Sequence, residues 1–317
     1  MRVPGLSRAA AAAARSWDMA ITDPGSRERA VDRPLDLMPL TGVMGAEAHG
    51  VDLVDIDDAT LAALRAAVCD RGVVILRDQR LTPETQTAFT RRLGPDAPVH
   101  FVEAMPGHPG VIRVLKEAAD GGAFNFGGAW HSDFSFEPAP PSFTILHAVD
   151  VPPYGGDTVW SSMYAAWESC ARAVQERLRG VTARHTARDA YSPKMQAIHS
   201  GLSSMRIVCD ESANDVHAHP LVTVHPETGR EVLFFNSAYV RDLRGVPSDE
   251  VPALLEWLHH HTTNIRFTAR HRWRAGDVAI WDNRCTQHLA LNDYAGARRE
   301  LHRTTVAGEV PMAAPAA

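Results

Sequence analysis

The chain has 317 residues, of which 45% are hydrophobic and 22% charged, and its formal net charge is -6. This apolar content is enough for a sizeable core, built either as two ordinary domains or as one large β-rich domain. The acidic balance leaves no basic surface for nucleic acid, and no run of about 18 apolar residues exists that could span a membrane. The four cysteines lack a CxxC spacing, which argues against a disulfide framework or a structural zinc site and favours a reducing cytoplasm.

The first 32 residues differ in composition from the rest of the chain. An unbroken alanine run spans Ala9–Ala14, arginines flank it, and no acidic residue precedes Asp18. This segment is predicted to be a disordered extension, or to precede the real start of translation at Met19. An arginine-rich, acid-poor stretch is also typical of a transit peptide, which is the alternative. One folded domain is therefore expected within residues 33–317.

Two helices and a strand are predicted at the beginning of that domain. Leu64 and Val68 recur at helical spacing, and Asp58 can cap that helix. The short apolar run Val73–Leu76 then indicates a buried strand. The residues Thr82–Glu84 begin a second helix, because they place a hydroxyl cap before a proline and an acid in the first turn.

The chain after Gly94 is rich in short β-type runs separated by proline, glycine and aspartate, which is typical of a sandwich or barrel. A long insert at about residues 161–216 interrupts this pattern, and a further helix is predicted at Ser248–His261. The predicted fold class is therefore mainly β with flanking helices. The runs predicted as strands are Val111–Leu115, Phe143–Val149, Leu221–Val224, Val232–Phe235, Asn264–Thr268, Val278–Trp281 and Thr304–Val306.

The pattern His131-Ser-Asp133 draws attention among sixteen histidines. In a strand, residues two apart point to the same face, so an imidazole and a carboxylate would meet at one point. Together they make two-thirds of the facial triad of two histidines and one carboxylate that binds non-haem Fe(II). An H-x-D pattern alone is weak, because it often arises by chance and a histidine bonded to a nearby aspartate is the better explanation of an isolated one.

A second cluster near the C-terminus strengthens the metal hypothesis. The strand predicted at Val278–Trp281 leads to His288, which can supply a third ligand from a distant part of the chain. Such a triad leaves three open coordination positions for a bidentate 2-oxoacid and dioxygen. Arg299 follows His288 by eleven residues and can bind the far carboxylate of that co-substrate in a bidentate manner.

These motifs together resemble the taurine dioxygenase family of Fe(II)/2-oxoglutarate-dependent oxygenases, which also includes the 2,4-dichlorophenoxyacetate dioxygenases. The likeness runs from about Leu37 to Val310. Its strongest parts are W-H-S-D at 130–133, G-G-D-T at 155–158 and the long segment from W-D-N-R to L-H-R at 281–303. Several spaced motifs in the right order are more specific than any one of them.

The resemblance implies a role for each matching residue. His131, Asp133 and His288 look like the iron ligands. Arg299 looks like the arginine that pairs with the C5 carboxylate of 2-oxoglutarate, and Thr158 looks like the hydroxyl that hydrogen-bonds the same carboxylate. The implied cofactor is Fe(II), and the implied co-substrates are 2-oxoglutarate and dioxygen.

Four further residues are candidates for substrate binding. Arg303 looks like the second arginine of the family, and it should share a strand face with Arg299, leaving it free for a substrate anion; a salt bridge on the barrel rim is the alternative. His100 and Glu103 stand where taurine enzymes have a histidine and a tyrosine, and Tyr239 where they have an aromatic. Glu103 at the mouth would favour a substrate amine or hydroxyl; exposure to solvent is the alternative.

The resemblance implies a double-stranded β-helix, or jelly roll, that oxidises a C–H bond of a small anionic or amphoteric molecule. Hydroxylation with release of succinate and CO2 is expected, and taurine itself is disfavoured by the missing partner residues. Desaturation or another oxidative rearrangement at the same iron is one alternative, and a non-catalytic, cupin-like binding barrel is the other. Succinate formation separates the last from the enzymes. Family members are often dimers or tetramers, so a homo-oligomer is possible.

Overall fold

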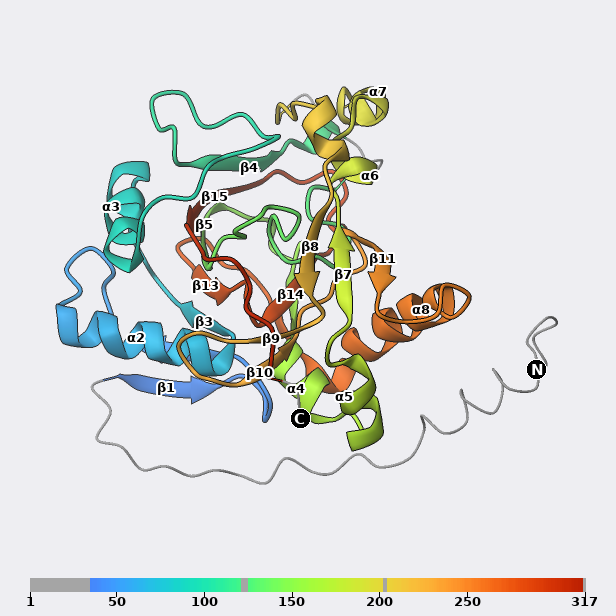
Figure 1. Ribbon diagram of the computed structural model, residues 1–317. Coiled ribbons are helices and arrows are strands. Elements are labelled where there is room, and N and C mark those ends of the chain that lie inside the picture. Colours follow the sequence, from blue (N-terminus) through green and yellow to red (C-terminus); the bar gives the residue numbers. More distant parts are fainter. Residues whose placement is uncertain (1–34, 121–124, 202–203, 316–317) are drawn as a thin grey trace.

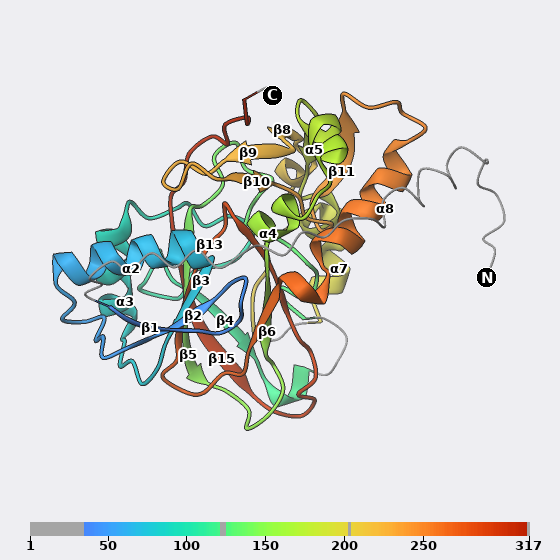
Figure 2. The ribbon, with the colours of Figure 1, turned by 90° about the horizontal axis from the view of Figure 1, so that it is seen from below.

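The structure is a computed structural model that describes residues 35–120, 125–201 and 204–315, so the extension predicted at residues 1–32 lies outside the described part. Strands form the centre of the molecule. Helices α2 (Asp58–Arg71) and α3 (Pro83–Leu93) lie on one side of it, and α8 (Val251–Thr262) lies on the other (Figures 1 and 2). This arrangement confirms a mainly β fold with flanking helices. No described helix is long and apolar enough to cross a membrane.

The largest sheet has seven strands in the order β1-β2-β3-β13-β5-β15-β4. Only the contact of β2 with β3 is parallel, and the remaining neighbours are antiparallel. Strand β15 lies near one edge, between β5 and β4. The strands are β1 (Asp36–Pro39), β2 (Ala46–His49), β3 (Val73–Leu76), β4 (Ile112–Lys116), β5 (Phe143–Asp150), β13 (Val278–Asp282) and β15 (Arg299–Val306).

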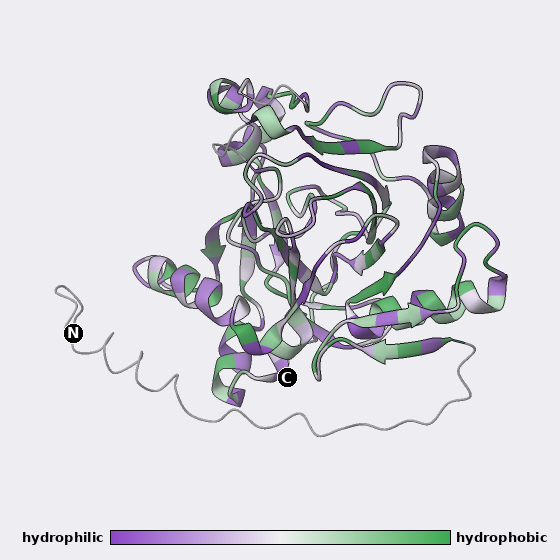
Figure 3. Cartoon of the chain, turned by 180° about the vertical axis from the view of Figure 1, so that it is seen from behind, coloured by the Kyte–Doolittle hydropathy of each residue, from purple (hydrophilic) through white to green (hydrophobic). Residues whose placement is uncertain are grey.

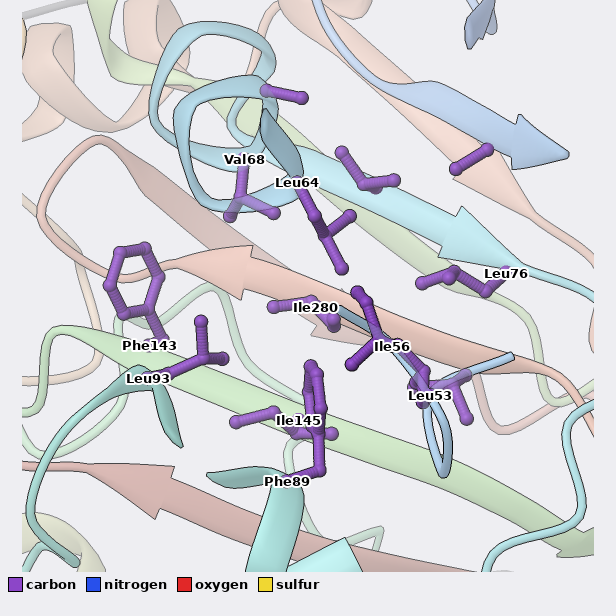
Figure 4. Packing of buried hydrophobic residues seen from close by; sticks show 14 of the residues in the cluster. Leu53, Ile56, Leu64, Val68, Leu76, Phe89, Leu93, Phe143, Ile145 and Ile280 are labelled. Atoms are coloured by element: carbon purple, nitrogen blue, oxygen red, sulfur yellow. The ribbon is translucent and has the colours of Figure 1, made fainter. Parts of the chain in front are cut away.

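Strands β3 and β13, at the centre of this sheet, are almost entirely apolar because both faces are covered. Alternate residues point to opposite faces. One set, including Ile145 and Ile280, packs under α2 and α3 against Leu64, Val68 and Phe89 (Figure 4). The other set packs into the interior of the barrel. The covering helices carry hydrophilic and hydrophobic residues side by side (Figure 3), as helices with one buried face do.

Side-chain caps begin both covering helices. Thr82 caps α3 in a reciprocal capping box with Thr85, and Pro83 takes the first helical position, which confirms the predicted start. The cap of α2 is Asp57, whose carboxylate accepts a hydrogen bond from the backbone N–H of Thr60 at 2.8 Å. The predicted cap, Asp58, is instead the first helical residue.

A buried glutamine on α3 ties this helix to the sheet. Gln86 donates from Nε2 to the carbonyls of Ile145 at 3.2 Å and His302 at 2.9 Å. Gln86→Ala removes these bonds and is expected to lower the free energy of unfolding by about 1–3 kcal/mol, measured by urea denaturation. Gln196→Ala is the control, because Gln196 is exposed and such changes usually stay within about 0.5 kcal/mol. Equal losses in the two variants would show that the buried bonds contribute nothing.

A second, three-stranded sheet packs against the face of the large sheet that is not covered by α2 and α3. Strand β6 (Thr158–Ser162) lies between β12 (Thr268–His271) and β14 (Thr286–Ala290). Trp160 of β6 is fully buried and packs with the inward residues of the large sheet, Ala279 and Trp281 among them. These two sheets enclose the space in which the candidate site lies.

The segment predicted as an insert contributes to the core of the fold. It contains α4 (Met163–Glu168), α5 (Arg172–Leu178) and β7 (Thr182–His185), which is the middle strand of a sheet with β11 (Val240–Arg244) and β8 (His217–Pro220). Residues of these elements share an apolar cluster with α8 and with the β9 (Val222–Val224) and β10 (Glu231–Leu233) ribbon. The described residues in the later part of the segment contain four short α- or 3-10 helices: α6 (Arg188–Tyr191), η2 (Pro193–Met195), α7 (Gln196–His199) and η3 (Glu211–Asn214).

Two strand predictions need correction. The run predicted as a strand at 264–268 is mostly a 3-10 turn, η4 (Ile265–Phe267), and the strand β12 begins only at Thr268. Asn264 caps that turn by accepting a hydrogen bond from the N–H of Arg266, which explains why the apolar residues do not extend. The residues Trp130–Asp133 are not in a strand either, apart from one isolated bridge residue.

Candidate active site

A backbone bridge brings two distant histidines together. The N–H of His131 donates to the carbonyl of His288 at 3.0 Å, and the N–H of His288 donates to that of His131 at 2.7 Å. The imidazole rings lie 4.1 Å apart between centroids. His288 belongs to β14 and pairs in register with Trp160 of β6. The second sheet therefore sets the position of both rings.

Asp133 joins this pair from the turn that follows the bridge. Its Oδ1 lies 3.6 Å from Nε2 of His131, and the three residues offer one ligand atom each within 4.8 Å of one another. Burial favours a raised pKa, but the guanidinium of Arg303, with Nη1 3.0 Å from Oδ1, holds the pKa of Asp133 well below its usual range. Asp133 is therefore ionised at neutral pH.

The ring nitrogens of the pair are arranged for metal binding. Nδ1 of His131 bonds to the carbonyl of Ala129 at 2.7 Å, so it carries the proton and leaves Nε2 with a free lone pair. Burial lowers the pKa of His288 well below its ordinary value, and its Nδ1 has no hydrogen-bond partner in the described part of the chain. Two neutral imidazoles and one carboxylate are the donor set that suits Fe(II) with open positions.

The two residues expected to hold 2-oxoglutarate are both buried, and Thr158 pairs with Ala290, two residues after His288 on β14. Arg299 begins β15, and Thr158 begins β6, where its hydroxyl accepts from Nε1 of Trp273 at 3.0 Å. Burial lowers the pKa of Arg299 to about 10, although Tyr294 and Asp157 act in the opposite direction, and no described carboxylate forms a salt bridge with it. Gly156 makes room for this arginine, since a Cβ there would lie 3.0 Å from its Cδ.

A cavity of about 660 Å³ is lined by two of the three clustered residues, His131 and Asp133. Arg303 lines it, flanked by the rings of Phe126 at 5.5 Å and Phe134 at 5.1 Å. Its Nε and Nη2 are buried without a partner among the described residues. Tyr239 lines the same cavity beside Tyr191, and burial raises the pKa of both phenols. The cavity thus presents cationic and hydroxyl donors next to the candidate metal site.

The motifs and this geometry agree with one known family. Residues 36–305 match the family described as "Taurine catabolism dioxygenase TauD, TfdA family". The chain belongs to this family. It is therefore an Fe(II)- and 2-oxoglutarate-dependent dioxygenase, an oxidoreductase that acts on a small molecule.

Relatives and solved structures of the TauD/TfdA family align with most of the chain. An "Alpha-ketoglutarate-dependent sulfate ester dioxygenase" of Pseudomonas putida is 36% identical over 281 residues, covering 88% of this chain and 91% of the relative. An "Alkylsulfatase" of Acinetobacter baylyi is 33% identical, covering 88% and 87%. The structure of a taurine dioxygenase from Burkholderia xenovorans aligns with a TM-score of 0.73 at 36% identity, covering 88% and 93%. This likeness confirms the predicted jelly roll.

Two residues predicted to bind substrate in this TauD/TfdA enzyme lie away from the cavity. The side chain of Glu103 is 56% exposed, and its carboxylate lies 3.8 Å from Nε of Arg206. His100 is exposed and bonds through Nδ1 to Oε1 of Glu137 at 2.6 Å. Neither residue lines the cavity, so the expected carboxylate at the mouth is not present there. Tyr191 was not identified from the sequence, because no motif surrounds it.

A second group of potential ligands is not suited to a metal. Cys69, His225 and Asp282 also cluster within 4.8 Å. However, Nε2 of His225 bonds to Asp282 at 2.9 Å, while its Nδ1 accepts the backbone N–H of Thr228 at 3.1 Å. The guanidinium of Arg284 pairs with Asp282 at 2.6 Å. The negative charge of Asp282 is therefore already balanced by Arg284, and the nitrogens of His225 are already hydrogen-bonded. The group links β13 to the turn after β9.

Proposed function

We propose that this enzyme hydroxylates a C–H bond of a small organic anion, most specifically an alkyl sulfate ester or sulfonate. The observation that carries the proposal is the buried guanidinium of Arg303, which lines the cavity with two unpaired nitrogens next to Asp133. A buried cation without a full set of acceptors favours an anionic partner. The named activities of the two relatives concern sulfate esters, whose charged group such an arginine can bind.

The proposed iron ligands are His131, Asp133 and His288, and their donor set fits Fe(II). Bound iron supplies the centre at which dioxygen is activated while 2-oxoglutarate is decarboxylated to succinate and CO2. The protein side chains hold and orient the reactants. Arg299 and Thr158 are proposed to bind the distal carboxylate, which would pair with a buried arginine that forms no salt bridge with a described residue and has only the more distant charge of Asp157 to offset its own.

The product of a sulfate ester follows from its chemistry. Hydroxylation of the carbon that bears the ester oxygen makes a geminal alcohol and sulfate, and this adduct collapses to an aldehyde or ketone and free sulfate. One dioxygen and one 2-oxoglutarate are consumed, and one succinate and one CO2 appear. Desaturation, the alternative outcome, would release no sulfate and would remove two hydrogens from the substrate.

A substrate panel tests this function. Enzyme loaded anaerobically with Fe(II) and 2-oxoglutarate is mixed with aerated alkyl sulfates, alkylsulfonates, phenoxyacetates and, as controls, the matching neutral alcohols. We expect succinate and sulfate in equal amounts from alkyl sulfates and only background succinate from the alcohols. Equal succinate from neutral alcohols and anions would contradict an anion-binding pocket.

Arg303→Ala is expected to weaken the binding of the anionic substrate by about 10- to 100-fold, since hydrogen bonds to charged groups are worth about 1.5–3 kcal/mol. The KM for 2-oxoglutarate should change little. Steady-state kinetics with each substrate varied in turn measure both values, and Mn(II) binding is measured in parallel because Arg303 also contacts Asp133. If only the 2-oxoglutarate KM rises, Arg303 belongs to the co-substrate site.

We also propose that the enzyme works in a reducing compartment such as the cytoplasm. All four cysteines are free thiols, which is usual where glutathione keeps proteins reduced. A reducing environment would also keep the bound iron in the Fe(II) state.

A further inference from the structure

The two carboxylate oxygens of Asp133 have different surroundings. Oδ1 faces the candidate metal position, 3.6 Å from Nε2 of His131, and also contacts Arg303. Oδ2 accepts a hydrogen bond from the hydroxyl of Thr144 at 2.7 Å. Both Asp133 and Thr144 are almost completely buried. Rotation of this carboxylate would break a short bond to a charged acceptor, which is about twice as strong as a neutral one.

The direction of the Thr144 hydroxyl is itself fixed by a chain of donors. The indole Nε1 of Trp281, which can only donate, bonds to Oδ1 of Asn283 at 2.9 Å. This contact orients the amide, so that Nδ2 of Asn283 donates to the hydroxyl oxygen of Thr144 at 2.8 Å. Because the ionised carboxylate of Asp133 can only accept and the amide nitrogen of Asn283 can only donate, the proton of the Thr144 hydroxyl points to Asp133. The order of donation is Trp281 to Asn283 to Thr144 to Asp133.

Backbone and side-chain hydrogen bonds of the barrel hold Thr144 and Asn283 in place. Thr144 of β5 pairs in register with Trp281 of β13 inside the large sheet. The backbone N–H of Asn283 donates to the carbonyl of Ser142 at 2.9 Å, and its carbonyl accepts from the hydroxyl of Ser132 at 2.7 Å. The turn that carries Asp133 and the strand end that carries Asn283 are thus bonded directly to each other.

We propose that Thr144 and Asn283 are positioning residues that hold Oδ2 of Asp133 away from the metal and keep Oδ1 directed at it. This inference rests on the proposed ligand set of His131, Asp133 and His288. Partners that orient a metal-binding carboxylate typically contribute about 10- to 100-fold to metal affinity. Loss of the Thr144 hydroxyl should therefore weaken metal binding without removing a ligand.

Thr144→Val keeps the shape of the side chain and deletes its hydroxyl, and Thr144→Ser restores the hydroxyl. Purified metal-free protein is titrated with Mn(II), and the EPR signal of free Mn(II) gives the Kd without any turnover. We expect the Kd of Thr144→Val to rise by about 10- to 100-fold, and that of Thr144→Ser to stay within about 3-fold of the wild type. Thr144→Ala is measured as well, so that the result does not depend on the packing of valine.

A matched control separates positioning from stability. Thr90 of α3 is also fully buried and bonds to the hydroxyl of Thr304 at 2.6 Å, and its hydroxyl bonds to none of the proposed ligands. Thr90→Val should lower the thermal midpoint as Thr144→Val does, yet leave the Kd for Mn(II) unchanged. Wild-type affinity in both Thr144→Val and Thr144→Ala would overturn the inference. Wild-type affinity in Asp133→Ala would instead overturn the proposed ligand set, so the two failures are distinguishable.

Discussion

Alanine at His131, Asp133 or His288 is expected to abolish Fe(II)-dependent succinate formation and high-affinity Mn(II) binding. Each residue offers one of only three ligand atoms in the group, and each is buried, so no solvent-exposed side chain can easily replace it. Removal of Asp133 also leaves two neutral imidazoles next to the positive charge of Arg303, which opposes cation binding. The measurements are succinate by chromatography and free Mn(II) by EPR, on the same preparations.

The control for these variants is another buried histidine. His219 bonds through Nε2 to the carbonyl of Glu137 at 3.0 Å and belongs to β8. His219→Ala creates a comparable loss of buried volume and is expected to retain Mn(II) binding. Near wild-type succinate formation in any two of the three ligand variants would show that the metal lies elsewhere.

Much of the fold was predictable because the central strands leave a simple signal. Val73–Leu76 and Val278–Trp281 are buried on both faces, and such strands read as continuous apolar runs. The start of α3 was also predictable, since Thr82 and Pro83 act through contacts within one helical turn. Local patterns of this kind do not depend on what the rest of the chain does.

The three candidate ligands do lie together, but not for the reason that the sequence pattern suggests. The H-x-D pattern predicts two residues on one face of a strand, yet Asp133 lies in a turn. His131 and His288 are instead held together by a reciprocal pair of backbone hydrogen bonds. Residues separated by more than 150 positions cannot be paired by periodicity, so only the motif resemblance connected them.

The residues that sequence reasoning missed act through long-range contacts without a motif. Thr144 is one hydroxyl in an apolar strand, and nothing in its neighbours along the chain marks its bond to Asp133. Tyr191 reaches the cavity from a short helix in the segment predicted as an insert. The family resemblance predicts Glu103 at the mouth of the site. In the structure its exposed carboxylate lies beside Arg206 instead, because the resemblance aligns positions in the sequence and does not fix where a side chain points.

Strand β15 carries both of the arginines that are proposed to bind anions. Arg299 and Arg303 are four residues apart on this strand, so their side chains point to the same side of the sheet. Arg303 already contacts the carboxylate of Asp133, whereas Arg299 forms no salt bridge with a described carboxylate and is influenced by Asp157 only at longer range. Of the two arginines, Arg299 therefore has more to gain from binding a carboxylate supplied by a ligand.

Arg299→Ala is accordingly expected to raise the apparent KM for 2-oxoglutarate by about 30-fold or more. Truncating one partner of a buried, hydrogen-bonded charge pair costs about 2–5 kcal/mol, and about 1.4 kcal/mol corresponds to a tenfold change. Thr158→Val should cost less, about 1–2 kcal/mol, because it removes a single hydrogen bond to a charged group. Initial rates of succinate-coupled substrate oxidation, with 2-oxoglutarate varied, measure both effects.

The neighbouring Arg298 provides the matched control for this prediction. Its guanidinium points to the other side of the strand, where it pairs with Glu117 at 3.1 Å and with Glu300, and its side chain is 39% exposed. Arg298→Ala removes the same charge from the residue just before the strand. Because this guanidinium already pairs with acidic side chains, its loss should leave the 2-oxoglutarate KM almost unchanged. If Arg298→Ala and Arg299→Ala raise this KM equally, the effect reflects the local net charge. A larger effect of Thr158→Val than of Arg299→Ala would likewise contradict binding of the distal carboxylate by a buried guanidinium, because the charged partner must contribute more than the neutral hydroxyl.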